Sequence, residues 1–456
     1  MVLAQRANSD LADALAEVEA RYCARHPRSA KRHAEAAEHM PGGNTRTVLH
    51  YSPFPLTWAS GRGNRLTDID GFEYVDLLGE YTAGLYGHSE PVIQAAVKQA
   101  IDDGTVLGGP NQYEAQLAAA IRARFPSIEL IRFTNSGTEA NLLALSAVRA
   151  DRPDRPRVMV FEGGYHGGVF YFGHGGSPLN MPLPWLMAEY NDVEGTRSLL
   201  RRHAGELAAV IVEPMQGSGG CIAGTPEFLG MLREECSAQD IVLIFDEVMT
   251  SRVSASGLQG RLGIRPDMTT LGKYLGGGAS FGAFGGRRDL MARFDPSAPN
   301  ALPHAGTFNN NVVSMAGGLA GLTKVFTPEA ATSLNALGDQ LRDRLNQAAQ
   351  RRGAPLQAIG VGSLIGLHFT RNSIRRPGDT HPHDAKGEQT LRDLQKLFHL
   401  EMIDQGYYLA RRGFIALSLP TTEADAEGFT AAVGEFLDAR GAMIERAASG
   451  WLLARE

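Results

Sequence analysis

The sequence of 456 residues predicts an α/β protein with a large domain built on a mainly parallel sheet and a smaller α+β domain. Between about residues 90 and 325, short apolar segments alternate with helix-length segments, as in parallel strands joined by helices. These apolar segments lack polar alternation, which indicates strands buried on both faces. We expect residues 90–325 to form the large domain and residues 326–456 the C-terminal small domain. The N-terminal segment, residues 1–89, is expected to contribute to the small domain.

Two elements are expected ahead of the large domain. Leu11, Leu15 and Val18 recur at helical spacing, which predicts an amphipathic helix over residues 10–23. Residues 56–78 alternate polar and apolar side chains around an Asp-Gly pair, which predicts a small antiparallel sheet.

The strands of the large domain are expected in six apolar segments. Thr225 and Pro226 mark one connecting helix between them, because Thr is a good N-cap and Pro suits the first helical position. The six segments are residues 128–134, 157–164, 207–214, 241–248, 268–272 and 281–286.

The C-terminal part predicts helices and strands in mixed order. Leucines from Leu334 to Leu345 form one apolar stripe, and later stripes follow around Leu394 and Val433. Two strand-like segments, residues 364–370 and 413–419, lie between the helices. The polar residues 372–389 are expected to form an exposed or mobile loop, in which the histidines of "HPHD" are solvated and bind no metal.

Composition excludes several classes of function. The net charge of -6 comes from 44 basic and 50 acidic residues without a block of one sign, so no nucleic-acid or anionic-membrane partner is expected. Three scattered cysteines are typical of reduced thiols. The N-terminus has no apolar signal-peptide core, and no apolar run approaches the ~18 residues of a membrane span. We therefore expect a cytoplasmic protein.

A turn between a strand and a helix is the first candidate binding motif. In "TNSGTEAN", Ser136 and Glu139 have the spacing of a capping box. The free amides and the dipole of the helix start suit an anion, and Gly137 lets the backbone approach it. A well-capped helix without a ligand is the alternative, and this motif alone does not decide between them.

Two charged residues follow predicted strands at the same sheet edge. Asp246 ends the segment "IVLIFD", and Lys273 follows "MTTLG". Taken singly, a salt bridge explains the aspartate and solvent exposure explains the lysine. Together with the helix start at Ser136, they match the needs of pyridoxal 5′-phosphate: a lysine for the aldehyde, a carboxylate for the pyridine nitrogen and a helix start for the phosphate.

The sequence resembles the class III aminotransferases of the fold-type I pyridoxal-phosphate superfamily. The resemblance covers about residues 36–440, and it rests on the order of "TNSGTEAN", "FEGGYHG", "VEPMQG", "FDEVMTSR", "TTLGKYLGGG" and "GTFNNN". It implies a pyridoxal 5′-phosphate enzyme that passes through pyridoxamine 5′-phosphate.

The resemblance also implies roles for individual residues. Lys273 would form the Schiff base and move the proton. The remaining cofactor-binding residues would be Asp246 at the pyridine nitrogen, Ser136, Gly137 and Thr138 at the phosphate, Tyr165 and Val248 on the two ring faces, and Glu213 behind them. Thr307 would reach the phosphate of a neighbouring subunit, which implies a homodimer with shared active sites.

Two arginines bear on the substrate. Arg46 matches the arginine that grips the substrate carboxylate in glutamate-1-semialdehyde aminomutases, and Met249 also resembles that branch rather than the Gln of many class III members. Arg412 has no counterpart in the aminomutase pattern, and a transaminase that accepts 2-oxoglutarate needs a second cation. Arg411 is an alternative to Arg412. Tyr81 and Tyr86 either line the substrate pocket or pack in the core.

The combination of "PGGNTRTVL", "EYTAGLYGHSEP" and "ARRGFIALSLP" resembles the bacterial β-phenylalanine aminotransferases. It predicts transfer of an amino group from an aromatic β-amino acid to 2-oxoglutarate or pyruvate, with Arg46 at the donor carboxylate and Arg412 at the acceptor. Glutamate-1-semialdehyde 2,1-aminomutase, another ω-transaminase and a non-catalytic cofactor-binding relative are the alternatives.

Overall fold

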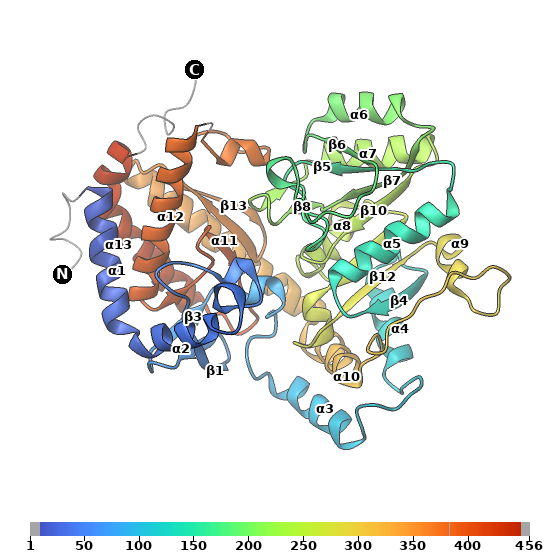
Figure 1. The fold of residues 1–456 in the computed structure, drawn as a ribbon, viewed down its shortest axis with the longest axis horizontal. Helices are drawn as coiled ribbons and strands as arrows, with labels where there is room; N and C mark the ends of the chain where they lie inside the picture. The colour runs from blue at the N-terminus through green and yellow to red at the C-terminus, as the bar shows by residue number, and fades with distance from the viewer. Residues whose placement is uncertain (1–9, 383, 448–456) are drawn as a thin grey trace.

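The computed structural model describes residues 10–382 and 384–447 of the chain. They form two lobes, with the large lobe on the right of Figure 1 and the small lobe on the left. Residues 1–9, on which the expected absence of a signal peptide partly rests, lie outside the described residues. No helix of the described part of the chain is long and apolar enough to cross a membrane.

The large lobe is built on a seven-stranded sheet, and the predicted mainly parallel sheet is confirmed. All the strands run in one direction except β12, which is antiparallel to β4 and to β11. The order across the sheet is β4 (Leu130–Thr134), β12 (Gly282–Gly286), β11 (Met268–Gly272), β10 (Val242–Asp246), β7 (Leu207–Val212), β5 (Arg157–Phe161) and β6 (Trp185–Ala188).

The six predicted strands are all present, and β6 was missed. This strand lies at the sheet edge. Its four residues are apolar but only Ala188 is buried, and so short an apolar run is a weak strand signal.

Helices cover both faces of this sheet, which explains the continuous apolar strands. Ala209 and Ile211 of β7 pack with α5 (Gly137–Asp151) on one face, and Val210 and Val212 pack with α7 (Pro226–Ala238) on the other. Thr225 caps α7 by accepting a hydrogen bond from the amide of Phe228 at 3.1 Å, as predicted. The remaining helices of this lobe are α3 (Pro91–Asp102), α4 (Glu114–Arg124), α6 (Val193–Arg202), α8 (Gly257–Leu262), α9 (Arg288–Met291) and α10 (Val312–Ala320).

The N-terminal residues pack with the C-terminal residues in the small lobe. Helix α1 (Leu11–Arg25) confirms the predicted first helix and lies beside α12 (Ala385–Asp404). The predicted antiparallel strands are β1 (Trp58–Arg62), β2 (Arg65–Asp68) and β3 (Glu73–Asp76), and β15 (Tyr407–Tyr408) adds to them in parallel. Helix α2 (Pro27–Ala37) follows α1.

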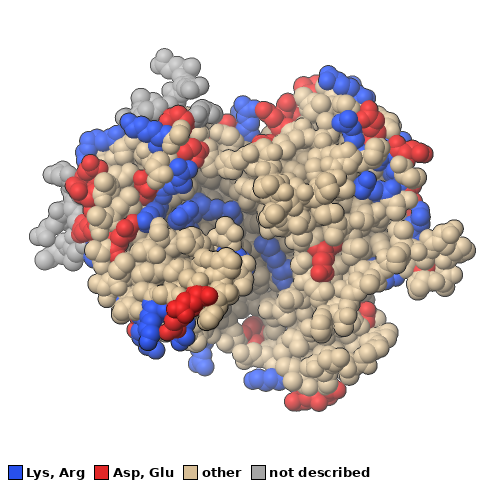
Figure 2. Space-filling view, viewed as in Figure 1, with Lys and Arg blue, Asp and Glu red and all other residues tan. Residues whose placement is uncertain are grey.

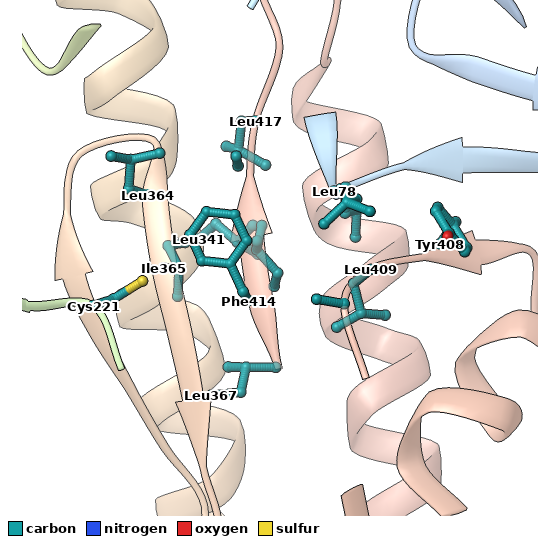
Figure 3. Packing of buried hydrophobic residues seen from close by; sticks show 14 of the residues in the cluster. Leu78, Cys221, Leu341, Leu364, Ile365, Leu367, Tyr408, Leu409, Phe414 and Leu417 are labelled. Atoms are coloured by element: carbon teal, nitrogen blue, oxygen red, sulfur yellow. The ribbon is translucent and has the colours of Figure 1, made fainter. Parts of the chain in front are cut away.

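A second sheet of the small lobe is antiparallel. It comprises β13 (Gln357–Val361), β14 (Leu364–His368) and β16 (Phe414–Ala416), and the helices α11 (Pro328–Arg351) and α13 (Glu423–Ala447) complete the lobe. Figure 3 shows leucine and isoleucine side chains of β14 beside Phe414 and Leu417, with Leu341 of α11 in the same buried cluster.

The prediction of a loop over residues 372–389 was wrong at its C-terminal end. Asp384 caps α12 by accepting hydrogen bonds from the amides of Lys386 at 3.0 Å and Gly387 at 2.9 Å, so the helix begins at Ala385. Its first turn is polar because it is exposed, and this polarity concealed the helix start. His383, one of the two histidines of "HPHD", lies outside the described residues.

Candidate active site

The predicted charged residues meet at one edge of the large sheet. Asp246 is the last residue of β10 and pairs in register with Thr270 of the parallel strand β11, three residues before Lys273. Ser136 follows β4 at the same edge. The antiparallel strand β12 enters there at Gly282, where a Cβ atom would lie 2.1 Å from the carbonyl oxygen of Ser136, so the close packing of this edge requires glycine.

Asp246 is buried and carries three hydrogen bonds. One carboxylate oxygen accepts from Nδ2 of Asn141 and from Nδ1 of His166, each at 2.8 Å, and the other accepts from the amide of Val248 at 3.0 Å. Asn141 is fixed in turn by the hydroxyl of Thr270 at 2.6 Å. These donors stabilise the ionised carboxylate in a buried position where an unpaired charge would be costly.

Lys273 sits on strained backbone with its amine inside the site. Its φ of 58° places a non-glycine residue in the left-handed region, which is a feature of functional sites. Its Nζ donates a hydrogen bond to the carbonyl oxygen of Tyr81. Burial lowers the pKa of Lys273 to about 8; the carboxylate of Asp246 opposes the shift, and the positive charges of Arg46 and Arg412 add to it.

The start of α5 lies against Gly272, the residue before Lys273, where a Cβ atom would lie 3.6 Å from the Cα atom of Gly137. The side chain of Ser136 accepts a hydrogen bond from the amide of Glu139 at 3.2 Å. The amides before it, of Gly137 and Thr138, have no intrahelical acceptor because they lie in the first turn of the helix. The reciprocal contact of the predicted capping box goes to the amide of Asn135 at 2.8 Å rather than to that of Ser136. Val248 packs on Gly137, where a Cβ atom would lie 2.9 Å from its Cγ2.

Tyr165 and Glu213 lie near Asp246 and are hydrogen-bonded to each other. The amide of Tyr165 donates to the carboxylate of Glu213 at 2.9 Å, and the amide of Gly217 donates to its second oxygen at 3.1 Å. Burial raises the pKa of Glu213 to about 7. Thr138 is close by, since a Cβ atom on Gly167 would lie 2.3 Å from its hydroxyl oxygen.

The two predicted arginines converge on one aromatic ring. The guanidinium carbons of Arg46 and Arg412 each lie 5.8 Å from the centre of the Tyr81 ring. Arg412 also donates to the hydroxyl of Ser218 at 3.4 Å, and Arg46 is paired with Glu80. Figure 2 shows Lys and Arg atoms in the hollow between the two lobes.

Tyr81 lies in the site, whereas Tyr86 packs in the core. Tyr81 contacts Lys273 and both arginines, whereas Tyr86 is buried and packs 6.1 Å from the ring of Tyr274. Arg411 lines a cavity of about 130 Å³ together with Arg412.

Thr307 is exposed on a loop of the large lobe. The following residues tie this loop to the phosphate motif, because Nδ2 of Asn135 donates to Asn309 at 3.0 Å. The role of Thr307 toward a neighbouring subunit stays a prediction.

Sequence reasoning gave no role to His166, Asn141 or Glu80. His166 directly follows Tyr165 in "GGYHG", and Asn141 lies one helical turn after Gly137, so its position on that face of α5 was readable. Nothing in the local sequence marks Glu80 as the partner of Arg46, because the two residues are 34 positions apart.

The arrangement fits pyridoxal 5′-phosphate. A half-buried lysine with a lowered pKa suits the aldehyde, a buried carboxylate with fixed donors suits a protonated pyridine nitrogen, and the start of α5 suits the phosphate. The fold and these residues define a pyridoxal-phosphate enzyme of fold type I.

The chain belongs to the class III aminotransferases, whose family model matches residues 49–388. It is 50% identical over 434 residues to a β-phenylalanine transaminase of Variovorax paradoxus, which covers 95% of this chain and 98% of the relative. The crystal structure of a β-phenylalanine aminotransferase from the same organism superposes with a TM-score of 0.91, at 49% identity, over 95% of this chain and 98% of that one.

A more distant relative bears on the alternative activity. A glutamate-1-semialdehyde 2,1-aminomutase of Thermodesulfovibrio yellowstonii is 35% identical over 422 residues, which are 88% of this chain and 96% of the relative. By its fold, its site and its family, the protein is a pyridoxal-phosphate-dependent aminotransferase.

Proposed function

We propose that this aminotransferase moves the amino group of an aromatic β-amino acid, of the 3-amino-3-phenylpropanoate type, to 2-oxoglutarate or pyruvate. The observation that carries the proposal is the pair of arginines on the ring of Tyr81, both within electrostatic reach of the amine of Lys273. The similarity to β-phenylalanine transaminase over nearly the whole chain supports the same substrate class.

Donor binding follows from the geometry of Arg46. Its guanidinium can form two parallel hydrogen bonds to a carboxylate, which orients the substrate as well as holding it. In a β-amino acid the amine is one carbon further from the carboxylate than in an α-amino acid, so the carboxylate must bind further from the lysine. Arg46 comes from the N-terminal segment, outside the sheet edge that holds Lys273.

Proton transfer is the proposed task of Lys273. When bound, the cofactor supplies an aldehyde that captures the donor amine and a ring that accepts the electron pair of the broken C–H bond. The amine of Lys273, with its pKa near 8, can take up that proton and return it at neutral pH. Asp246, held by His166 and Asn141, would keep a positive charge on the ring nitrogen.

Arg412 would serve the second half-reaction. 2-Oxoglutarate has two carboxylates. One would lie where the donor carboxylate binds or next to the reacting carbonyl, and the other needs a second cation. Arg412 lies beside Tyr81 and Phe414 at 5.8 and 5.7 Å, so it contacts aromatic surface that an apolar substrate side chain can also cover.

The test is a half-reaction assay on the holoenzyme. Adding 3-amino-3-phenylpropanoate should bleach the visible cofactor band and release 3-oxo-3-phenylpropanoate, and 2-oxoglutarate should restore the band with one glutamate formed per amine lost. A Lys273→Ala variant should bind the cofactor without turnover. Absence of bleaching with this donor, together with conversion of glutamate-1-semialdehyde, would replace the proposal with the aminomutase.

The proposed assembly is a homodimer in which Thr307 reaches the phosphate of the neighbouring subunit. Support comes from apolar side chains on the surface of the same lobe, since Phe308, Val106 and Leu107 are 58%, 79% and 56% exposed. Thr307→Ala and Lys273→Ala dimers should each be impaired, and mixing them should restore activity by forming one intact site per hybrid. Hybrids without recovered activity would contradict a shared site.

A further inference from the structure

A strained turn, residues 80–82, contacts Arg46 and Lys273, and the ring of its Tyr81 also lies beside Arg412. Glu80, Tyr81 and Thr82 have φ values of 44°, 50° and 83°, so three consecutive non-glycine residues lie in the left-handed region. Such a run persists only where its surroundings fix it. Here Asp76 accepts hydrogen bonds from the amides of Leu78 at 2.9 Å and of Gly79 at 3.0 Å, just ahead of the turn.

Each residue of this turn contacts a different part of the site or its support. The carboxylate of Glu80 pairs with Arg46, and the carbonyl of Tyr81 accepts from Nζ of Lys273. The carbonyl of Thr82 lies 3.5 Å from a guanidinium nitrogen of the buried Arg252. The turn therefore fixes where the carboxylate of Glu80 stands relative to the lysine.

The two arginines differ in their counter-ions. Arg46 has an internal carboxylate, that of Glu80, whereas among residues 10–382 and 384–447 no carboxylate lies within ion-pair distance of Arg412. A carboxylate approaching Arg412 meets an uncompensated cation. One approaching Arg46 meets a guanidinium that is already neutralised.

We propose that Glu80 is a specificity-determining residue whose carboxylate occupies Arg46 until the carboxylate of the amino donor replaces it. This inference rests on the proposed role of Arg46. Donor binding at Arg46 is then an exchange of one carboxylate for another, which disfavours small anions that lack further contacts. Glu80 also repels a second carboxylate near Arg46 and so directs that of a dicarboxylate acceptor to Arg412.

The size of the effect follows from the exposure of the pair. The side chains of Arg46 and Glu80 are 44% and 51% exposed, and pairs this exposed are weak because water screens them. Removing the charge of Glu80 should therefore strengthen carboxylate binding at Arg46 by up to about fivefold.

The probe is 3-phenylpropanoate, which has the donor carboxylate and ring but no amine, and its neutral control is 3-phenylpropanamide. Both are titrated into the holoenzyme by calorimetry. Glu80→Gln should bind the acid about three- to fivefold more tightly and the amide unchanged. The KM for the aromatic donor should fall by a similar factor while kcat stays the same, because the contact is equal in ground and transition states.

Matched variants separate the specific effect of the Glu80 carboxylate from a general loss of negative charge and from a loss of folded structure. Glu80→Asp keeps the carboxylate and should not gain affinity, and Glu234→Gln removes an exposed charge of α7 and should change nothing. Glu80→Gly suits the left-handed backbone and should reproduce the gain if the glutamine variant folds poorly.

An Arg46→Ala background distinguishes the two assignments. In this background 3-phenylpropanoate should bind weakly, and adding Glu80→Gln should not change its affinity. If Arg46→Ala weakens the acid but Glu80→Gln leaves it unchanged in the native background, the inference about Glu80 is wrong. If Arg46→Ala leaves acid binding intact, the proposed carboxylate site is wrong, and the inference falls with it.

Discussion

The lowered pKa of Lys273 predicts how fast the apo-protein captures its cofactor at each pH. Only the neutral amine attacks an aldehyde, and burial lowers the pKa of this amine from 10.5 to about 8. Because the charged form is the disfavoured one, the neutral form is populated as the pH rises through 8 rather than through 10.5. The capture rate should rise about tenfold per pH unit below this midpoint and level off above it.

At neutral pH the lowered pKa greatly increases the fraction of Lys273 in its reactive, neutral form. At pH 7 about one tenth of an amine with a pKa of 8 is neutral, against roughly 0.03% of an ordinary lysine, a difference of roughly 300-fold. Nearby charges should move the midpoint in opposite directions. Arg46→Ala removes a charge that lowers the pKa and should shift the profile to higher pH, whereas Asp246→Asn should shift it to lower pH.

Stopped-flow absorbance of pyridoxal 5′-phosphate binding to the apo-protein, from pH 6 to 10, measures this profile. The same titration with Nα-acetyl-lysine, after division by the neutral fraction of its own amine, corrects for the ionisation of the cofactor itself. A corrected profile that still rises tenfold per unit between pH 9 and 10 would refute a lowered pKa. Shifts of equal sign in both variants would refute the electrostatic explanation.

Three further predictions concern individual contacts. Arg412→Ala should raise the KM for 2-oxoglutarate by the equivalent of about 2–5 kcal/mol if the pair is desolvated, and affect the aromatic donor far less; equal losses in steady-state kinetics would contradict its role. His166→Phe removes a charge-assisted hydrogen bond to Asp246, worth about 1.5–3 kcal/mol, and should lower kcat and shift the cofactor absorbance. His166→Asn keeps a hydrogen-bond donor and should partly restore both. An unchanged spectrum in His166→Phe would mean that His166 only packs against its neighbours. Ser136→Ala removes the cap of α5 and should lower the unfolding free energy by about 1 kcal/mol, measured by denaturant titration. It should also weaken cofactor affinity, measured by fluorescence. A loss of stability with unchanged affinity would mean that Ser136 caps the helix without binding the phosphate.

The fold was largely readable because the pattern of apolar residues follows burial. Strands covered on both faces must be apolar throughout, and six such segments were recognised. The exceptions were a short strand and a polar helix start: β6 has only four residues, too few for a clear pattern, and the first turn of α12 is exposed and polar. The parallel pairing of β3 with β15 joins residues more than 330 positions apart, and no local signal predicts it.

The residues of the site were found as motifs, but their partners were not. Asp246 and Lys273 stand at strand ends, where the rules of parallel sheets bring side chains to a common edge. The donors that fix Asp246 come from α5 and from the loop after β5. The packing of α5 on β11 and β12 places Asn141 beside the carboxylate, and Asn141 also donates to the carbonyl oxygen of His166 at 2.9 Å.

The sequence by itself determined the class of fold, the lysine, the carboxylate and the helix start, because each depends on chemistry that local residues carry. The tertiary structure decided the environment of those groups: the burial that lowers the pKa of Lys273, the left-handed turn at Glu80 and the meeting of Arg46 with Arg412 over Tyr81. Desolvation and through-space charge act between atoms that are close in space, and the distance between residues along the chain does not encode them.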